Sequence, residues 1–71
     1  MFPNLKAEMG RKNIDMTALA KDEELSLSYE SIRNKLTRKS EWTNREMQII
    51  QKKYFPECTL EYLFEYQEEN A

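Results

Sequence analysis

The chain of 71 residues has no histidine and only one cysteine, Cys58. A single cysteine excludes an internal disulfide, and the lack of histidine excludes a Cys/His metal cluster. A lone thiol is typical of the reducing cytoplasm rather than of secretion. The sequence also lacks a Gly-rich phosphate loop and any Ser or Cys beside a plausible base. We therefore expect a cytoplasmic protein that is not an enzyme, with no metal, cofactor or small-molecule ligand.

Residues that interrupt helices are scarce, since there are one glycine and two prolines. This scarcity favours an all-α fold. A chain of this size buries only about 60% of its unfolded surface, so the core must be compact. The longest apolar run has three residues, and the N-terminal sequence MFPNLKAEMGRKN has no signal-peptide apolar region. We predict one compact domain over residues 1–71, with no membrane span and a frayed tail at 67–71.

Charge is distributed unevenly, although the formal net charge is only −2. The segment 33–53 carries seven basic residues and two acids, whereas the segment 57–71 carries five glutamates and no base. A run of three acids also occurs at 22–24. Nucleic-acid binders are usually basic, but the local field of the basic segment could attract phosphate.

Five capping residues precede apolar patterns of helical spacing: Asn4, Asp15, Ser28, Thr43 and Thr59. They predict five short helices joined by short turns. The sequence TNRE at 43–46 is a capping box, and Pro56 should end the helix that it begins. In the first helix we expect Gly10 to allow a close helix contact. In the second we expect Ala18 and Leu19 to turn inward, with Met16 as a further candidate.

Aromatic residues supply much of the expected core. Tyr54, Phe55 and Phe64 are predicted to be buried, and Tyr62 and Tyr66 to lie on the surface or in a dimer contact. Trp42 is expected to anchor the loop after the third helix by packing; a contact with sugar-phosphate is the alternative.

The third helix has one apolar side and one polar side at 100° per residue. Ile32 and Leu36 define the buried side, and Glu30, Asn34 and Thr37 lie opposite, flanked by Arg33 and Arg38. Arginine pairs with guanine in the major groove of DNA, asparagine with adenine, and glutamate accepts from cytosine. The helix start and the loop after it suit phosphate contacts. The alternative is a solvated helix face.

Four stretches resemble the phage repressor/Cro-like helix-turn-helix family, in particular the small phage-type repressors of Gram-positive bacteria. They are NLKAEMGRKNI, MTALA, LSYESIRNKLTRKSEWT and FPECTLEYLF. The resemblance covers residues 4 to about 66. It implies a lambda-repressor-like fold of five helices, with a turn at about 22–27 and a recognition helix at about 28–37. It also implies a homodimer that binds a two-fold symmetric operator in double-stranded DNA as a transcriptional repressor in a phage or prophage setting.

The same resemblance implies a set of contacts with DNA. Residues facing base edges would be Tyr29, Glu30, Arg33 and Asn34. Residues near phosphates would be Met16, Thr17, Ser28, Thr37, Arg38 and Lys39.

The turn departs from the family pattern. A glycine normally stands four residues after the alanine of the second helix, here Ala20, but that position is Glu24. The best match to the glycine is Ser26, which leaves two inserted residues. The acidic insertion should either lengthen the second helix or enlarge the turn, and both would change the angle of the third helix.

Two alternatives to this interpretation follow from the residues. Leu25, Tyr29, Ile32 and Leu36 have helical spacing, so one continuous helix over 22–36 would bury Tyr29 and abolish the turn. A protein-interaction module of the same fold, without specific DNA binding, would suit the acidic insertion, the acidic tail and the net charge.

Overall fold

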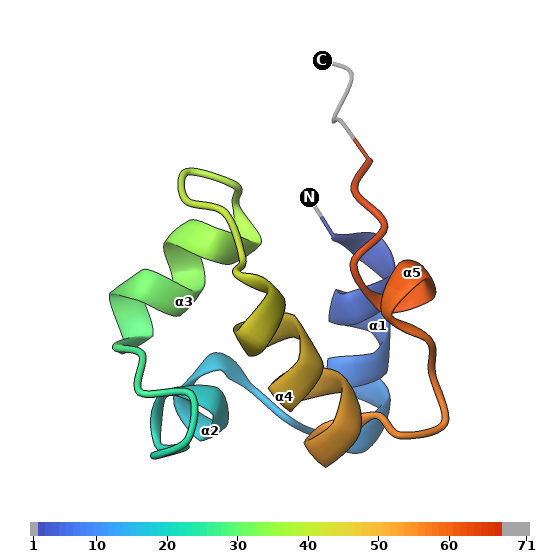
Figure 1. The fold of residues 1–71 in the computed structure, drawn as a ribbon, viewed down its shortest axis with the longest axis horizontal. Coiled ribbons are helices and arrows are strands. Elements are labelled where there is room, and N and C mark those ends of the chain that lie inside the picture. The colour runs from blue at the N-terminus through green and yellow to red at the C-terminus, as the bar shows by residue number, and fades with distance from the viewer. Residues whose placement is uncertain (1, 68–71) are drawn as a thin grey trace.

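The computed structural model describes residues 2–67, and these residues form five α-helices and no strand. The helices are α1 (Pro3–Lys12), α2 (Met16–Ala20), α3 (Tyr29–Leu36), α4 (Asn44–Tyr54) and α5 (Leu60–Leu63). The all-α prediction is confirmed. Figure 1 shows α2 and α3 on one side of α4, and α1 and α5 on the other.

Local capping explains where four of the helices begin. Four side-chain oxygens accept a hydrogen bond from the amide three residues later, as predicted: those of Asp15, Ser28, Thr43 and Thr59. The capping box between Thr43 and Glu46 is complete. A first helix is present, but the prediction that Asn4 caps it was wrong. It begins at Pro3, whose fixed φ suits a first helical position, and the Asn4 side chain instead donates to the Tyr62 carbonyl at 2.8 Å.

Left-handed backbone among residues 2–67 occurs without glycine. Three residues there adopt positive φ: Asn13 at 59°, Ser26 at 56° and Arg38 at 65°. Asn13 ends α1 in the left-handed conformation that asparagine tolerates. Gly10 lies inside α1, and a Cβ added there would meet nothing within 4 Å. The predicted close contact at Gly10 is therefore wrong.

The core forms where the helices converge. Its buried apolar residues are Phe2, Leu5, Met9, Leu19, Leu25, Ile32, Trp42, Ile50, Phe55 and Leu63. Helix α2 packs on α3, while α5 packs on α1 and α4. In the second helix Leu19 is buried as expected, but Ala18 is exposed and Ala20 is half-buried in its place. Trp42 is a packing residue, as predicted, with its ring edge-on to Phe64 at 5.7 Å between centroids.

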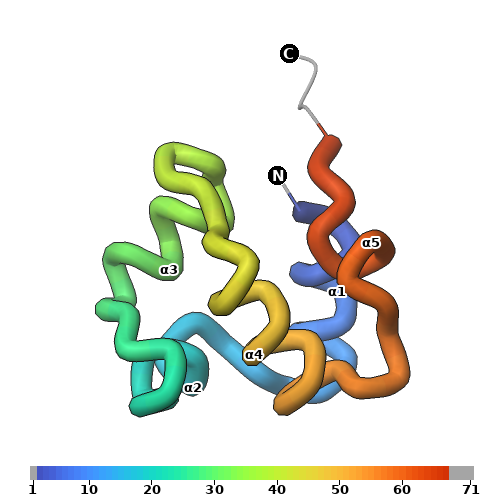
Figure 2. The backbone as a smooth tube through the Cα atoms, viewed as in Figure 1, coloured from blue at the N-terminus to red at the C-terminus, as the bar shows by residue number. Residues whose placement is uncertain are grey.

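The two ends of the described chain lie side by side (Figure 2). The Phe2 ring contacts the Tyr66 ring at 5.4 Å between centroids, and Tyr66 is half-buried. Tyr62 is exposed, as predicted for a surface residue. Of the tail predicted to fray, only Gln67 is described; residues 68–71 lie outside the described residues. No helix in the described part of the chain is both long enough and apolar enough to cross a membrane.

Candidate nucleic-acid interface

Helix α3 is a short helix closed by side-chain hydrogen bonds at both ends. The Ser28 hydroxyl accepts from the Ser31 amide at 3.1 Å. At the other end the Thr37 hydroxyl donates to the carbonyls of Arg33 and Asn34. The alternative of one continuous helix over 22–36 is wrong. Ser28 has extended backbone angles and is the N-cap of α3, so no helix continues from the connection into α3.

The outward face of α3 presents three of the four residues expected at base edges. Tyr29 is 47% exposed, and Glu30 and Arg33 are also exposed. Tyr29 and Arg33 are one helical turn apart, so their side chains are neighbours. Within residues 2–67 none of these three side chains has a hydrogen-bond or ion-pair partner. Asn34 is half-buried, and its carbonyl accepts from the amides of Lys39 and Ser40 in the loop that follows.

The residues expected near phosphates differ in exposure and in whether their side chains already have a partner within the fold. Thr17 and Lys39 are exposed, and in the described part of the chain their side chains have no partner. The hydroxyls of Ser28 and Thr37 already bond within α3. Met16 is half-buried. Arg38 lies over the Tyr66 ring at 4.2 Å and 3.9 Å from the Glu41 carboxylate, so it would have to leave both to reach a phosphate.

One basic residue of the segment 33–53, Lys35, is buried rather than on the surface. Lys35 is 9% exposed, and its ammonium lies 2.9 Å from the Glu46 carboxylate and 3.0 Å from the Glu41 carbonyl. Burial opposes ionisation of Glu46, but the Thr43 amide and the Lys35 ammonium together hold the pKa of Glu46 below its usual value. Lys35 therefore joins the end of α3 to the start of α4 and adds little to the field at the surface.

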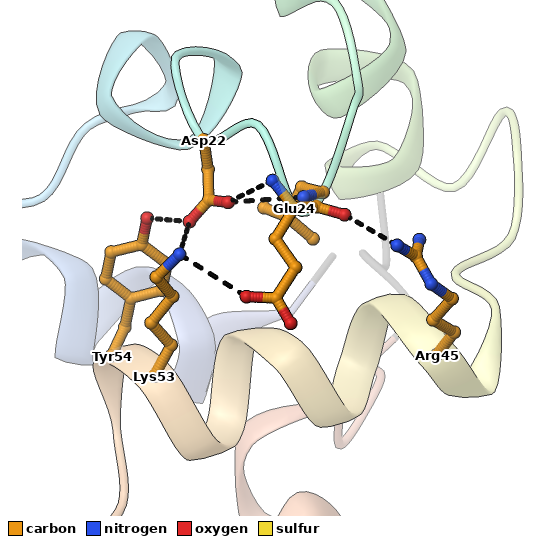
Figure 3. A network of polar contacts seen from close by, with 6 residues as sticks. Asp22, Glu24, Arg45, Lys53 and Tyr54 are labelled. Atoms are coloured by element: carbon orange, nitrogen blue, oxygen red, sulfur yellow. Dashed lines mark hydrogen bonds and ion pairs between the residues drawn. The ribbon is translucent and has the colours of Figure 1, made fainter.

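The acidic run at 22–24, expected from the family resemblance to be an insertion, lies in the connection between α2 and α3 and does not lengthen α2, because α2 ends at Ala20 and α3 begins at Tyr29. Its first acid, Asp22, is buried. One Asp22 oxygen accepts from the amides of Glu24 and Leu25, and the other accepts from the Tyr54 hydroxyl and lies 3.0 Å from the Lys53 ammonium. Figure 3 shows this carboxylate between the connection and the end of α4.

These contacts shift the ionisation of both partners. The Tyr54 hydrogen bond outweighs burial and, with Lys53 and the two amides, lowers the pKa of Asp22 to about 2. Burial and the same carboxylate raise the pKa of Tyr54 to about 12. Asp22 is thus a permanent anion at neutral pH, neutralised within the fold instead of facing solvent.

A second contact holds the connection further along. The Arg45 guanidinium donates to the Glu24 carbonyl at 2.8 Å, and Leu25 follows as a core residue that is 2% exposed. Ser26, the residue matched to the family's glycine, has a φ of 56°, in the region that glycine adopts most easily. The sequence did not show that Asp22 and Glu24, the acids before Ser26, bind α4.

Sequence reasoning missed the roles of Asp22, Tyr54 and Lys53, since their partners are about 30 residues away and only the acidic run marked the connection.

A scan of protein-family models and searches of curated proteins and of solved structures find no match to this chain.

Proposed function

We propose that the protein is a sequence-specific DNA-binding regulator of transcription. In this proposal α2 and α3 form a lambda-repressor-like helix-turn-helix, and α3 enters the major groove. The observation that carries the proposal is the outward face of α3, where Tyr29, Glu30 and Arg33 are exposed and have no partner among residues 2–67, while Ile32 is buried behind them. A major groove about 12 Å wide admits an α-helix, and an arginine there pairs with guanine.

Phosphate contacts would come from the edges of this surface. The Lys39 ammonium and the Thr17 hydroxyl are exposed for this role, and phosphate contacts fix the register of a protein on DNA without reading sequence. Binding as a homodimer to a two-fold operator would place two α3 helices about 34 Å apart, one turn of the duplex. An occupied operator would then block polymerase, which is the action expected of a cytoplasmic repressor of the phage or prophage kind.

Selection of sites from a random duplex pool tests this proposal. Wild-type protein should enrich a palindrome, and its affinity should fall by roughly 10³- to 10⁵-fold between 50 and 200 mM salt if the dimer neutralises six to ten phosphates. Arg33→Ala and Asn34→Ala should relax preference at single positions, whereas Lys39→Ala should weaken all sequences alike. An Arg33→Ala protein that enriches the wild-type motif would refute the base-contact assignment.

The second candidate is a protein-interaction module that does not bind specific DNA. The pairing of basic side chains favours it. Four of the seven basic residues of segment 33–53 are bound within the fold: Lys35, Arg38, Arg45 and Lys53. In a chain of net charge −2, this leaves few cations for phosphate. Failure to enrich any duplex, with weak binding that vanishes in salt, would support this candidate.

A further inference from the structure

We propose that Asp22 is a positioning residue for α3: it fixes the orientation of α3 relative to α4, and thereby sets the affinity for specific DNA without touching it. The second half of this inference rests on the proposed function. The first half concerns the free protein and can be tested without DNA.

The carboxylate of Asp22 joins two elements that are far apart in the sequence. One oxygen holds the backbone of the connection through the amides of Glu24 and Leu25, at 2.8 and 3.2 Å. The other oxygen holds the last turn of α4 through Tyr54 and Lys53. A carboxylate buried in this way loses water, and the four donors replace it.

A second contact between the connection and α4 fixes the direction of the connection along α4. Arg45, in the first turn of α4, donates to the Glu24 carbonyl. Arg45 and Lys53 are eight residues apart, which is about 12 Å along a helix. The connection is therefore held at both ends of α4 (Figure 3).

Little freedom remains between these attachments and α3. Leu25 is buried in the core, Ser26 is held at a positive φ, and Ser28 already caps α3. The far end of α3 is held separately by Lys35 and Glu46. Release of Asp22 would thus let α3 pivot about its last turn, which carries Arg33 and stays attached, and would displace Tyr29 and Glu30 in the first turn most.

Charge and positioning predict opposite effects for the same substitution. Asp22→Asn removes one negative charge from a DNA-binding protein, which by charge alone should strengthen binding to all duplexes. Glu23→Gln is the matched control, because Glu23 is the neighbouring acid, is exposed and has no partner within the described residues. If Asp22 positions α3, Asp22→Asn should weaken binding to the selected duplex, since a displaced α3 loses base contacts.

The experiment compares wild type, Asp22→Asn and Glu23→Gln for binding to the selected duplex and to a scrambled duplex of equal length. Loss of one or more base contacts should weaken specific binding by Asp22→Asn by about 5- to 150-fold, with scrambled-duplex binding equal to that of Glu23→Gln. Equal behaviour of the two variants on both duplexes would overturn the proposal. If Asp22→Asn only reduced the fraction of folded protein, its affinities for the selected and for the scrambled duplex would fall by the same factor.

Residual dipolar couplings of the free proteins measure the α3–α4 angle directly. We expect Asp22→Asn to change or broaden the couplings of Tyr29–Arg33 and Glu23→Gln to leave them as in wild type; unchanged couplings in Asp22→Asn would overturn the proposal. If wild type selects no sequence, the proposed function fails, and the couplings still decide the role of Asp22 in the free protein. Should Asp22→Asn not fold, Tyr54→Phe removes one donor to Asp22 at constant charge, with the same expected direction and the same refuting result.

Discussion

Replacement of Lys35 by methionine should destabilise the protein severely, although lysine is usually a surface residue. The Lys35 and Glu46 side chains are 11% and 10% exposed, and their charged atoms are 2.9 Å apart. Methionine keeps the length and most of the volume of the side chain but removes the ammonium. The Glu46 carboxylate would then stay buried with the Thr43 amide as its remaining bonded donor.

The magnitude follows from the cost of an unpaired buried charge. Removing one partner of a buried ion pair costs about 3 to 5 kcal/mol, whereas replacing both partners with neutral groups is often close to neutral. We therefore expect Lys35→Met to lower the free energy of unfolding by about 3 kcal/mol, or the Tm by about 12 to 24 °C for a domain of this size. The double variant Lys35→Met with Glu46→Gln should recover most of this loss, because glutamine retains an oxygen for the Thr43 amide.

Urea unfolding followed by circular dichroism and by Trp42 fluorescence measures these differences. Without Lys35, burial should raise the pKa of Glu46 above its unfolded value, so Lys35→Met should approach wild type in stability as the pH falls from 7 towards 4. A loss below about 1 kcal/mol at pH 7, or a double variant as unstable as the single one, would show that the pair is effectively solvated and that the reasoning from burial is wrong.

Three further substitutions test the structure at separate points. Gly10→Ala should raise the free energy of unfolding by up to about 1 kcal/mol in urea titrations, because the added Cβ meets no atom within 4 Å and alanine favours the helix; a destabilised variant would show that the space is filled. Ser28→Ala should cost about 1 kcal/mol by loss of the α3 cap, and thermal unfolding with no change in Tm would contradict that role. The pKa of Asp22 is lowered to about 2 by folding, so its contribution of about 2 kcal/mol is present at neutral pH and is lost as the pH falls from about 4 to 2. Acid titration of wild type should show this loss, and in Asp22→Asn the pH dependence should be flatter; equal slopes would refute it.

The helices were predictable where the determinants are local. Asp15, Ser28, Thr43 and Thr59 each bond an amide three residues away, so the sequence around each cap is enough to predict it. Asn4 shows the limit of that rule: its side chain bonds the Tyr62 carbonyl, 58 residues away, and the helix starts on Pro3 instead.

The candidate interface was predictable only in part for the same reason. Helical spacing placed Arg33 at the flank of the polar face and Ile32 on the buried side, and the structure has Arg33 exposed and Ile32 buried. Spacing could not show that Lys35 is neutralised by Glu46, or that Asp22 is held by Tyr54 and Lys53. These pairs depend on which helices meet in space. A count of charges along the chain cannot show this, because it treats every charged side chain as solvated.

An NMR titration of the labelled wild-type protein with the selected duplex and with a scrambled one tests the proposed DNA-binding surface. The proposed function predicts that the amide shifts of Tyr29, Glu30 and Arg33 change most with the selected duplex, with smaller changes at Thr17 and Lys39 for both duplexes. Changes confined to α1 and α5, or identical changes with the two duplexes, would contradict it.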